Sequence, residues 1–109
     1  MSETNPAANG AASACINALT VGGSLQIQDV EAMRERLRRL FDGLGPLCID
    51  VGDLLAVDTA GVQLLVALRL DAARRGRELY FRGESPRLDQ ALDLLGLRGA
   101  VYGAQRHGV

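Results

Sequence analysis

The chain has 109 residues, of which 48% are hydrophobic and 23% charged, with a formal net charge of −1. This length suits one small domain with one core. Aromatic residues make up only 4%, so stacking platforms for single-stranded nucleic acid are missing, and the net charge gives no electrostatic case for nucleic acid or an acidic membrane surface. No apolar run reaches the ~20 residues of a membrane span, and no basic segment precedes an apolar stretch at the N-terminus. We therefore expect a cytoplasmic protein without membrane insertion or a nucleic-acid partner.

Metal and phosphate-binding motifs are missing from the sequence. Cys15 and Cys48 lie in apolar surroundings, where we expect buried thiols, and neither belongs to a Cys-x-x-Cys pair. His107 is the single histidine, so a Cys/His metal site cannot be assembled within one chain. The chain has no lysine and hence no Gly-x-x-x-x-Gly-Lys loop. We predict neither a metal nor a cofactor, although a nucleotide near the turn described below stays open.

The first segment, residues 1–13, is rich in Ala, Asn, Ser and Gly and is predicted to be a flexible tail. The domain itself is expected to span residues 14–103. Residues 14–20 have a weak strand pattern, and Ser24 to Ile27 alternate like a second short strand. Because Gly22-Gly23 lies between these strands, a hairpin is the predicted connection.

A helix is predicted to follow, with Asp29 as its N-cap. Its apolar residues recur at spacings of three and four, which gives one inward stripe: Val30, Met33, Leu37, Leu40 and Phe41. The other face carries four arginines interleaved with acids. A solvated charged face is the simpler interpretation, and a docking surface is the alternative. Asp42 to Pro46 ends the helix with glycine and proline.

The centre of the chain is the turn Asp58-Thr59-Ala60-Gly61. The apolar run Leu47–Val51 predicts a buried strand before it, and the dense apolar stretch Val62–Ala73 predicts a helix of about four turns after it. Thr59 lies where this helix begins, so its hydroxyl can cap the first turn. The same place is the positive end of a helix dipole and tolerates phosphate. The alternative is that Asp58 and Thr59 are only a capping pair.

The long helix has more apolar residues than one core face requires. Its predicted core face is Gly61, Leu64, Leu65, Leu68 and Ala72, with Gln63 and Arg74 on the opposite side. Val62, Val66 and Leu70 are predicted to lie off the core face. An exposed apolar stripe of this kind marks a partner site, and the alternatives are cover by another helix or self-association as a homodimer.

The last third continues the alternation of strands and helices. Arg74, Arg75 and Gly76 end the long helix, Glu78–Arg82 reads as a strand, and Ser85-Pro86 starts another helix. Ala100 to Tyr102 add a short final element, and residues 104–109 form a C-terminal tail. This order predicts an α/β fold with a small mixed, partly parallel β-sheet and α-helices packed on one face.

Over residues 14–102 the chain resembles a STAS domain, the sulfate-transporter and anti-sigma factor antagonist family. The motifs that carry the resemblance are Gly23-Ser24-Leu25, Leu47–Val51, Asp58-Thr59-Ala60-Gly61 with Leu64-Leu65, Arg75-Gly76, and Ser85-Pro86 with Leu94-Leu95-Gly96-Leu97. The resemblance implies the STAS fold. It also implies a non-enzymatic signalling switch of the anti-sigma factor antagonist type, which binds a serine/threonine kinase, an anti-sigma factor or a chemotaxis or two-component partner.

In this family the hydroxyl residue after the aspartate is phosphorylated by the partner kinase, and Thr59 matches that position. The partner-binding residues expected from the resemblance and the helix pattern are Asp58, Thr59, Ala60, Val62, Gln63, Val66 and Leu70. The pair Thr59-Ala60 also resembles the STAS subunits of lipid-trafficking ABC transporters, which dock on the ATPase without phosphorylation. That is the alternative function.

An enzyme is the least favoured class. Asp50, Asp53 and Asp58 lie near one another in the sequence, but no histidine or lysine is close enough in sequence to complete a catalytic constellation with them. We therefore predict no catalytic residue.

Overall fold

The computed structural model describes residues 18–103, and its strands form two small parallel sheets. The larger sheet has the order β1-β3-β5, formed by Ala18–Thr20, Leu47–Asp50 and Leu79–Arg82. The smaller one pairs β2 (Gly23–Leu25) with β4 (Leu54–Val57), also in parallel. The predicted α/β class is therefore confirmed, although the strands form two parallel sheets and not one mixed sheet.

The predicted hairpin between the first two strands is wrong. β1 pairs with β3 and β2 pairs with β4, so Gly22-Gly23 bends the chain without reversing it. The register shifts at Gly23, whose φ is 71°, and this irregularity separates the two sheets. A similar break at residues 51–53 separates β3 from β4. Two segments of the chain thus run side by side, each divided into two short strands.

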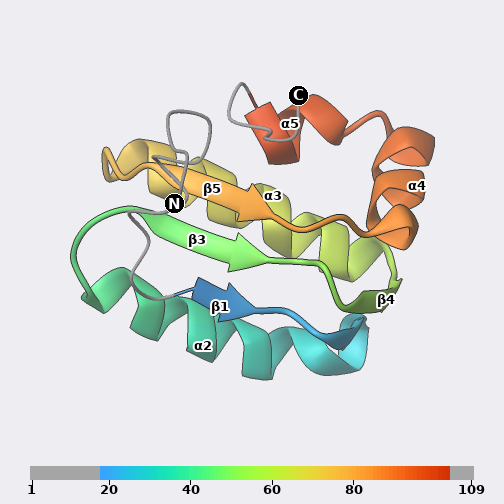
Figure 1. Cartoon of the computed structure of the whole chain (residues 1–109), viewed down its shortest axis with the longest axis horizontal. Coiled ribbons are helices and arrows are strands. Elements are labelled where there is room, and N and C mark those ends of the chain that lie inside the picture. Colours follow the sequence, from blue (N-terminus) through green and yellow to red (C-terminus); the bar gives the residue numbers. More distant parts are fainter. Residues whose placement is uncertain (1–17, 104–109) are drawn as a thin grey trace, which may run out of the picture.

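Helices connect the strands of the larger sheet (Figure 1). The short 3-10 helix η1 (Ile27–Asp29) leads into α2 (Val30–Asp42), which returns the chain from β2 to β3, and α3 (Thr59–Arg74) returns it from β4 to β5. Because β1, β3 and β5 follow each other across the sheet in chain order, both helices lie on the same face. The predicted long helix is confirmed over Thr59–Arg74.

Two further helices complete the described chain. α4 (Pro86–Leu95) packs against β4, and α5 (Arg98–Tyr102) packs against α3 and α4. The predicted start at Ser85-Pro86 is confirmed, since the Ser85 hydroxyl accepts a hydrogen bond from Leu88 N at 3.2 Å and donates one to Leu54 O at 2.8 Å. Ser85 is buried, so one side chain joins the helix start to β4.

The core is formed mainly by leucine and valine side chains from the sheet and from α3. Val62 is part of this core with 0% exposure, so the prediction that it lies off the core face is wrong. The reason is that α3 contacts α2 as well as α4 and α5, and a wider arc of its surface is covered than a helix on a sheet alone would bury.

Further predictions concern the two tails and the cysteines. The two tails, Cys15 and His107 lie outside the described residues. Cys48 is 1% exposed, as expected, but it is not a free thiol. Within residues 18–103, no helix combines the length and apolar character that crossing a bilayer requires.

Candidate functional site

The site is built around Asp58, which is the N-cap of α3. Its Oδ1 accepts a hydrogen bond from Gly61 N at 3.0 Å, and its Oδ2 accepts one from Ile27 N at 2.9 Å. The backbone N–H of Asp58 donates to Leu25 O at 3.4 Å. Asp58 therefore caps the helix and fastens the loop after β2 to it. The prediction that the Thr59 hydroxyl caps this helix is wrong, because Thr59 is its first residue.

Gly61 allows the same loop to lie directly against α3. A Cβ atom built at this position would lie 2.1 Å from Leu25 O, far inside van der Waals contact. Only glycine leaves room for this backbone approach. The motif thus has a structural explanation at its first and last positions, and Thr59 and Ala60 are the positions that it leaves available for contact.

Thr59 is exposed at the positive end of the α3 dipole, as predicted. Within residues 18–103, no hydrogen bond involves its side chain. Ala60 is half-buried and Gln63, one turn further, is exposed. The hydroxyl is therefore presented to solvent on a rigid scaffold, which suits a residue that another protein contacts or modifies.

The other predicted partner-binding residues lie at different depths. Leu70 is 60% exposed and Val66 is half-buried against the core, whereas Val62 is fully buried. The structure therefore does not bring Val62, Val66 and Leu70 together as one exposed stripe. The outward face of α3 instead carries Thr59, Gln63 and Leu70, at helical spacings of four and seven residues.

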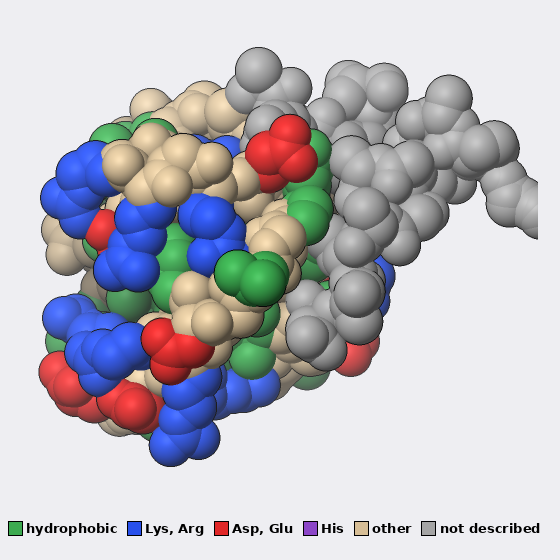
Figure 2. Space-filling view, turned by 90° about the vertical axis from the view of Figure 1, so that its left-hand side faces the viewer, with side chains coloured by type: hydrophobic (Ala, Val, Ile, Leu, Met, Phe, Trp, Pro, Cys, Tyr) green, Lys and Arg blue, Asp and Glu red, His purple; other side chains and the backbone are tan. Residues whose placement is uncertain are grey.

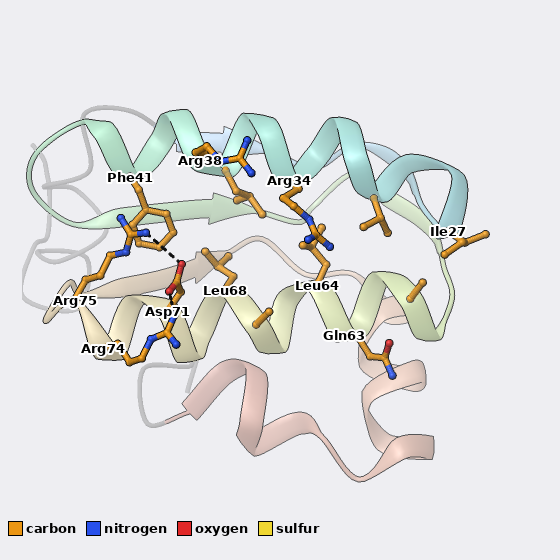
Figure 3. A pocket seen from close by; sticks show the side chains of 14 residues that line it. Ile27, Arg34, Arg38, Phe41, Gln63, Leu64, Leu68, Asp71, Arg74 and Arg75 are labelled. Carbon is orange, nitrogen blue, oxygen red and sulfur yellow. Dashed lines mark hydrogen bonds and ion pairs between the residues drawn. The ribbon is translucent and has the colours of Figure 1, made fainter.

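Next to this face lies a groove between α2 and α3 with a volume of about 500 Å³ (Figure 3). Ile27, Ala60 and Gln63 line the end near Thr59, and Asp71, Arg74 and Arg75 line the other end. This groove was not predicted from the sequence. The signal that could have found it is the run of small or polar residues Ala60, Gln63 and Ala67 on one side of α3, which leaves space beside α2.

Two of the three carboxylates considered for catalysis, Asp50 and Asp58, have structural partners, and Asp53 is exposed. Asp50 Oδ1 accepts from Gly52 N at 2.9 Å, and its Oδ2 lies 3.4 Å from Arg82 Nε. Asp58 is the cap described above. Among residues 18–103, no group of three or more His, Cys, Asp or Glu side chains is placed to hold a metal ion.

Comparisons with known proteins agree with the fold. The profile of the family described as "Mlab, STAS domain" matches residues 11–102. A crystal structure described as a sulfate transporter family protein from Wolinella succinogenes has a TM-score of 0.68 at 18% sequence identity, covering 83% of this chain and 74% of that chain, which is a likeness of fold alone. A search of curated proteins finds no match. Because the family profile spans most of its length, this chain belongs to the STAS-domain family of the Mlab type.

Proposed function

We propose that this chain is a non-enzymatic binding module of the anti-sigma factor antagonist kind. It docks a protein partner through the N-terminal end of α3, and phosphorylation of Thr59 regulates the docking. The observation that carries the proposal is the exposed Thr59 at the first position of α3, beside Gln63 and the mouth of the groove.

Phosphorylation at this position would change the charge of the docking end. A phosphate adds about −1.5 to −2 charges next to the carboxylate of Asp58, whose two oxygens already accept hydrogen bonds from Ile27 N and Gly61 N. In a desolvated interface, like charges facing each other cost several kcal/mol. A partner with an acidic group opposite Thr59 would therefore be released by the modification, while the fold of the module stays the same.

A second candidate function keeps the docking end but not the modification. The Thr59-Ala60 pair resembles the STAS subunits of lipid-trafficking ABC transporters, and the matching family profile is the Mlab one. In this case the partner is an ABC ATPase, and the Thr59 hydroxyl is a contact at the interface.

The test measures binding of the purified chain to a serine/threonine kinase, an anti-sigma factor and an ABC ATPase from the same cell by isothermal titration calorimetry. Thr59→Glu is expected to lower the affinity for the true partner by roughly tenfold or more, because it brings a charge into the interface. Thr20→Glu is the matched control, since Thr20 is also exposed but lies at the end of β1. It is expected to bind as the wild type does.

Incubation with kinase and ATP, followed by mass spectrometry, separates the two candidates. Phosphate on Thr59 together with release of the partner supports the switch, and Thr59→Ala should then stay bound. A stable complex with the ATPase in which Thr59 is never modified supports the second candidate. If Thr59→Glu and Thr20→Glu bind every partner equally well, docking through this end of α3 is refuted.

A further inference from the structure

The groove between α2 and α3 has an apolar floor. Leu37 from α2 and Leu64 and Leu68 from α3 form it, and all three are almost fully buried beneath the opening. Ala67 is exposed at its middle, where its small side chain leaves the floor accessible. A ligand that enters the groove therefore meets aliphatic side chains along its length.

The rim of the groove is basic. Arg34 and Arg38 from α2 and Arg74 and Arg75 from α3 line it, and Asp71 is the one acidic residue among its lining residues. The Asp71 carboxylate is already paired with Arg74 and lies 3.6 Å from Arg75 Nη2 (Figure 3), and Arg38 is paired with Glu35, which lies outside the groove. Four arginines against these two carboxylates leave the rim with a net positive charge. Figure 2 shows the left-hand end of the molecule in Figure 1, where blue side chains lie around green ones and red side chains lie among them. The rim therefore favours a ligand with negative charge.

The guanidinium of Arg75 lies 4.4 Å from the centre of the Phe41 ring, so it covers an apolar side chain at the charged end of the groove. Arg75 thus shields the Phe41 ring from solvent. When Arg75 turns outward, an apolar side chain of a ligand can pack against the ring in its place. Arg75 is 54% exposed, so this movement needs no change in the core.

We propose that the groove is the docking site for an acidic amphipathic helix of the partner protein. Its apolar side chains would occupy the floor at spacings of three and four residues, and its carboxylates would pair with the arginines on both rims. From Ala60 to Arg75 the groove follows α3 for about 22 Å, the length of a helix of about 15 residues. The inference rests on the proposed function, because the groove begins at the docking end of α3.

Other occupants lack the required chemistry. Residues 1–17 contain one acidic residue, Glu3, and residues 104–109 contain none, so neither end of this chain can neutralise the four arginines. A second copy placed face to face would bring the two basic rims together, because a twofold interface uses the same patch on both subunits. Charge complementarity thus favours a different, acidic chain.

The probe for the test is a fluorescein-labelled synthetic helix of about 15 residues, with leucines at spacings of three and four and glutamates on both flanks. Its binding to the full chain is measured by fluorescence anisotropy. We expect saturable binding that weakens several-fold between about 50 and about 500 mM salt, because ions screen exposed charge pairs. A peptide of the same composition in scrambled order should not bind.

Two pairs of variants locate the binding site. Ala67→Tyr fills the groove, whereas Ala73→Tyr adds the same ring at an exposed position of α3 outside it. Arg34→Glu reverses a rim charge, whereas Arg39→Glu reverses an exposed charge on α2 outside the groove. The first variant of each pair should lower the affinity by roughly tenfold, and the second should leave it unchanged.

Equal binding to all four variants, or no binding of the probe, overturns the inference. Binding of phosphatidylglycerol vesicles that is lost in Ala67→Tyr but kept in Ala73→Tyr also overturns it, since the occupant would then be a lipid. These results are independent of the Thr59→Glu experiment. A partner that is sensitive to Thr59→Glu but not to Ala67→Tyr refutes the groove as a docking site and leaves the proposed function intact.

Discussion

The backbones of Leu25 and Gly61 approach more closely than any side chain at position 61 would allow. This contact holds the loop after β2 against the first turn of α3, and the Asp58 carboxylate fixes it from the other side. Asp58 and Gly61 therefore determine the position of the exposed Thr59 between them.

Gly61→Ala tests this contact. Because the new Cβ atom would lie 2.1 Å from Leu25 O, the loop and the helix must separate, and we expect a loss of about 3 kcal/mol in the free energy of unfolding. Gly99→Ala in α5 is the control, since a Cβ there meets nothing within 4 Å. Urea denaturation should show little change, or a slight gain, for the control. A Gly61→Ala protein as stable as the wild type contradicts the close approach.

The importance of the Asp58-Thr59-Ala60-Gly61 turn could be predicted from the sequence, but the roles within it could not. Aspartate and threonine are both good N-caps, so the pattern does not tell which of them precedes the first helical turn. The burial of Val62 was also missed, because a helical wheel assumes one covered face and α3 is covered by neighbours on more than one side.

At the scale of secondary structure elements, Arg69 connects three parts of the fold. From α3, its guanidinium donates to Val101 O at 2.8 Å and to Tyr102 O at 2.9 Å in α5, and to Leu79 O at 3.3 Å in β5. Burial lowers the pKa of Arg69 from its ordinary value, although the group remains charged. It also lies 5.7 Å from the centre of the Phe81 ring. The short α5 therefore depends on a side chain from another helix.

Arg69→Met should loosen α5 without unfolding the rest of the domain. Loss of hydrogen bonds from a charged donor to carbonyls costs about 1.5–3 kcal/mol for each well-formed bond that is not replaced by water. Hydrogen exchange measured by mass spectrometry should show faster exchange in Arg98–Tyr102, with little change in β3. Arg39→Met, an exposed arginine on α2, is the control. Unchanged exchange in α5 would show that Arg69 does not hold it.

The elements with strong local signals were predicted well. The helix over Thr59–Arg74 and the start at Ser85-Pro86 follow from apolar periodicity and capping residues close in sequence. The pairing of β1 with β3 was missed because these strands are far apart in the sequence, with α2 between them. Gly22-Gly23 suggested a local turn instead. Strand pairing between distant segments has no comparable local signature.

At the scale of the whole molecule, two surface carboxylates are expected to contribute to stability in acid. Hydrogen bonds from the Ser24 hydroxyl and from Gln26 N lower the pKa of Asp29 below its ordinary value of 3.8, and a hydrogen bond from Arg98 lowers the pKa of Asp93. A carboxylate whose pKa is lower in the folded state than in the unfolded state stabilises the fold at pH values above its pKa in the unfolded state. This contribution to stability is lost as the pH falls through the pKa of the folded state.

The free energy of unfolding should therefore decrease as the pH falls below 3.8. Asp29→Asn combined with Asp93→Asn removes both groups and should make the decrease smaller, while it lowers stability at neutral pH. Urea denaturation at a series of pH values measures the two curves. Parallel curves for the wild type and the double variant would show that other carboxylates control the acid response.

The hydrogen bonds of Asp58 also bear on chimeras in which residues 24–29 or 58–61 are replaced by those of another family member. Residues 24–29 and 58–61 meet through the Asp58–Ile27 hydrogen bond and the Leu25–Gly61 contact, although they are far apart along the chain. Residues 24–29 take part in both contacts through backbone atoms, Ile27 N and Leu25 O, so the match depends on the aspartate at 58 and the glycine at 61. A chimera that exchanges residues 24–29 should therefore keep both contacts as long as these two residues are retained.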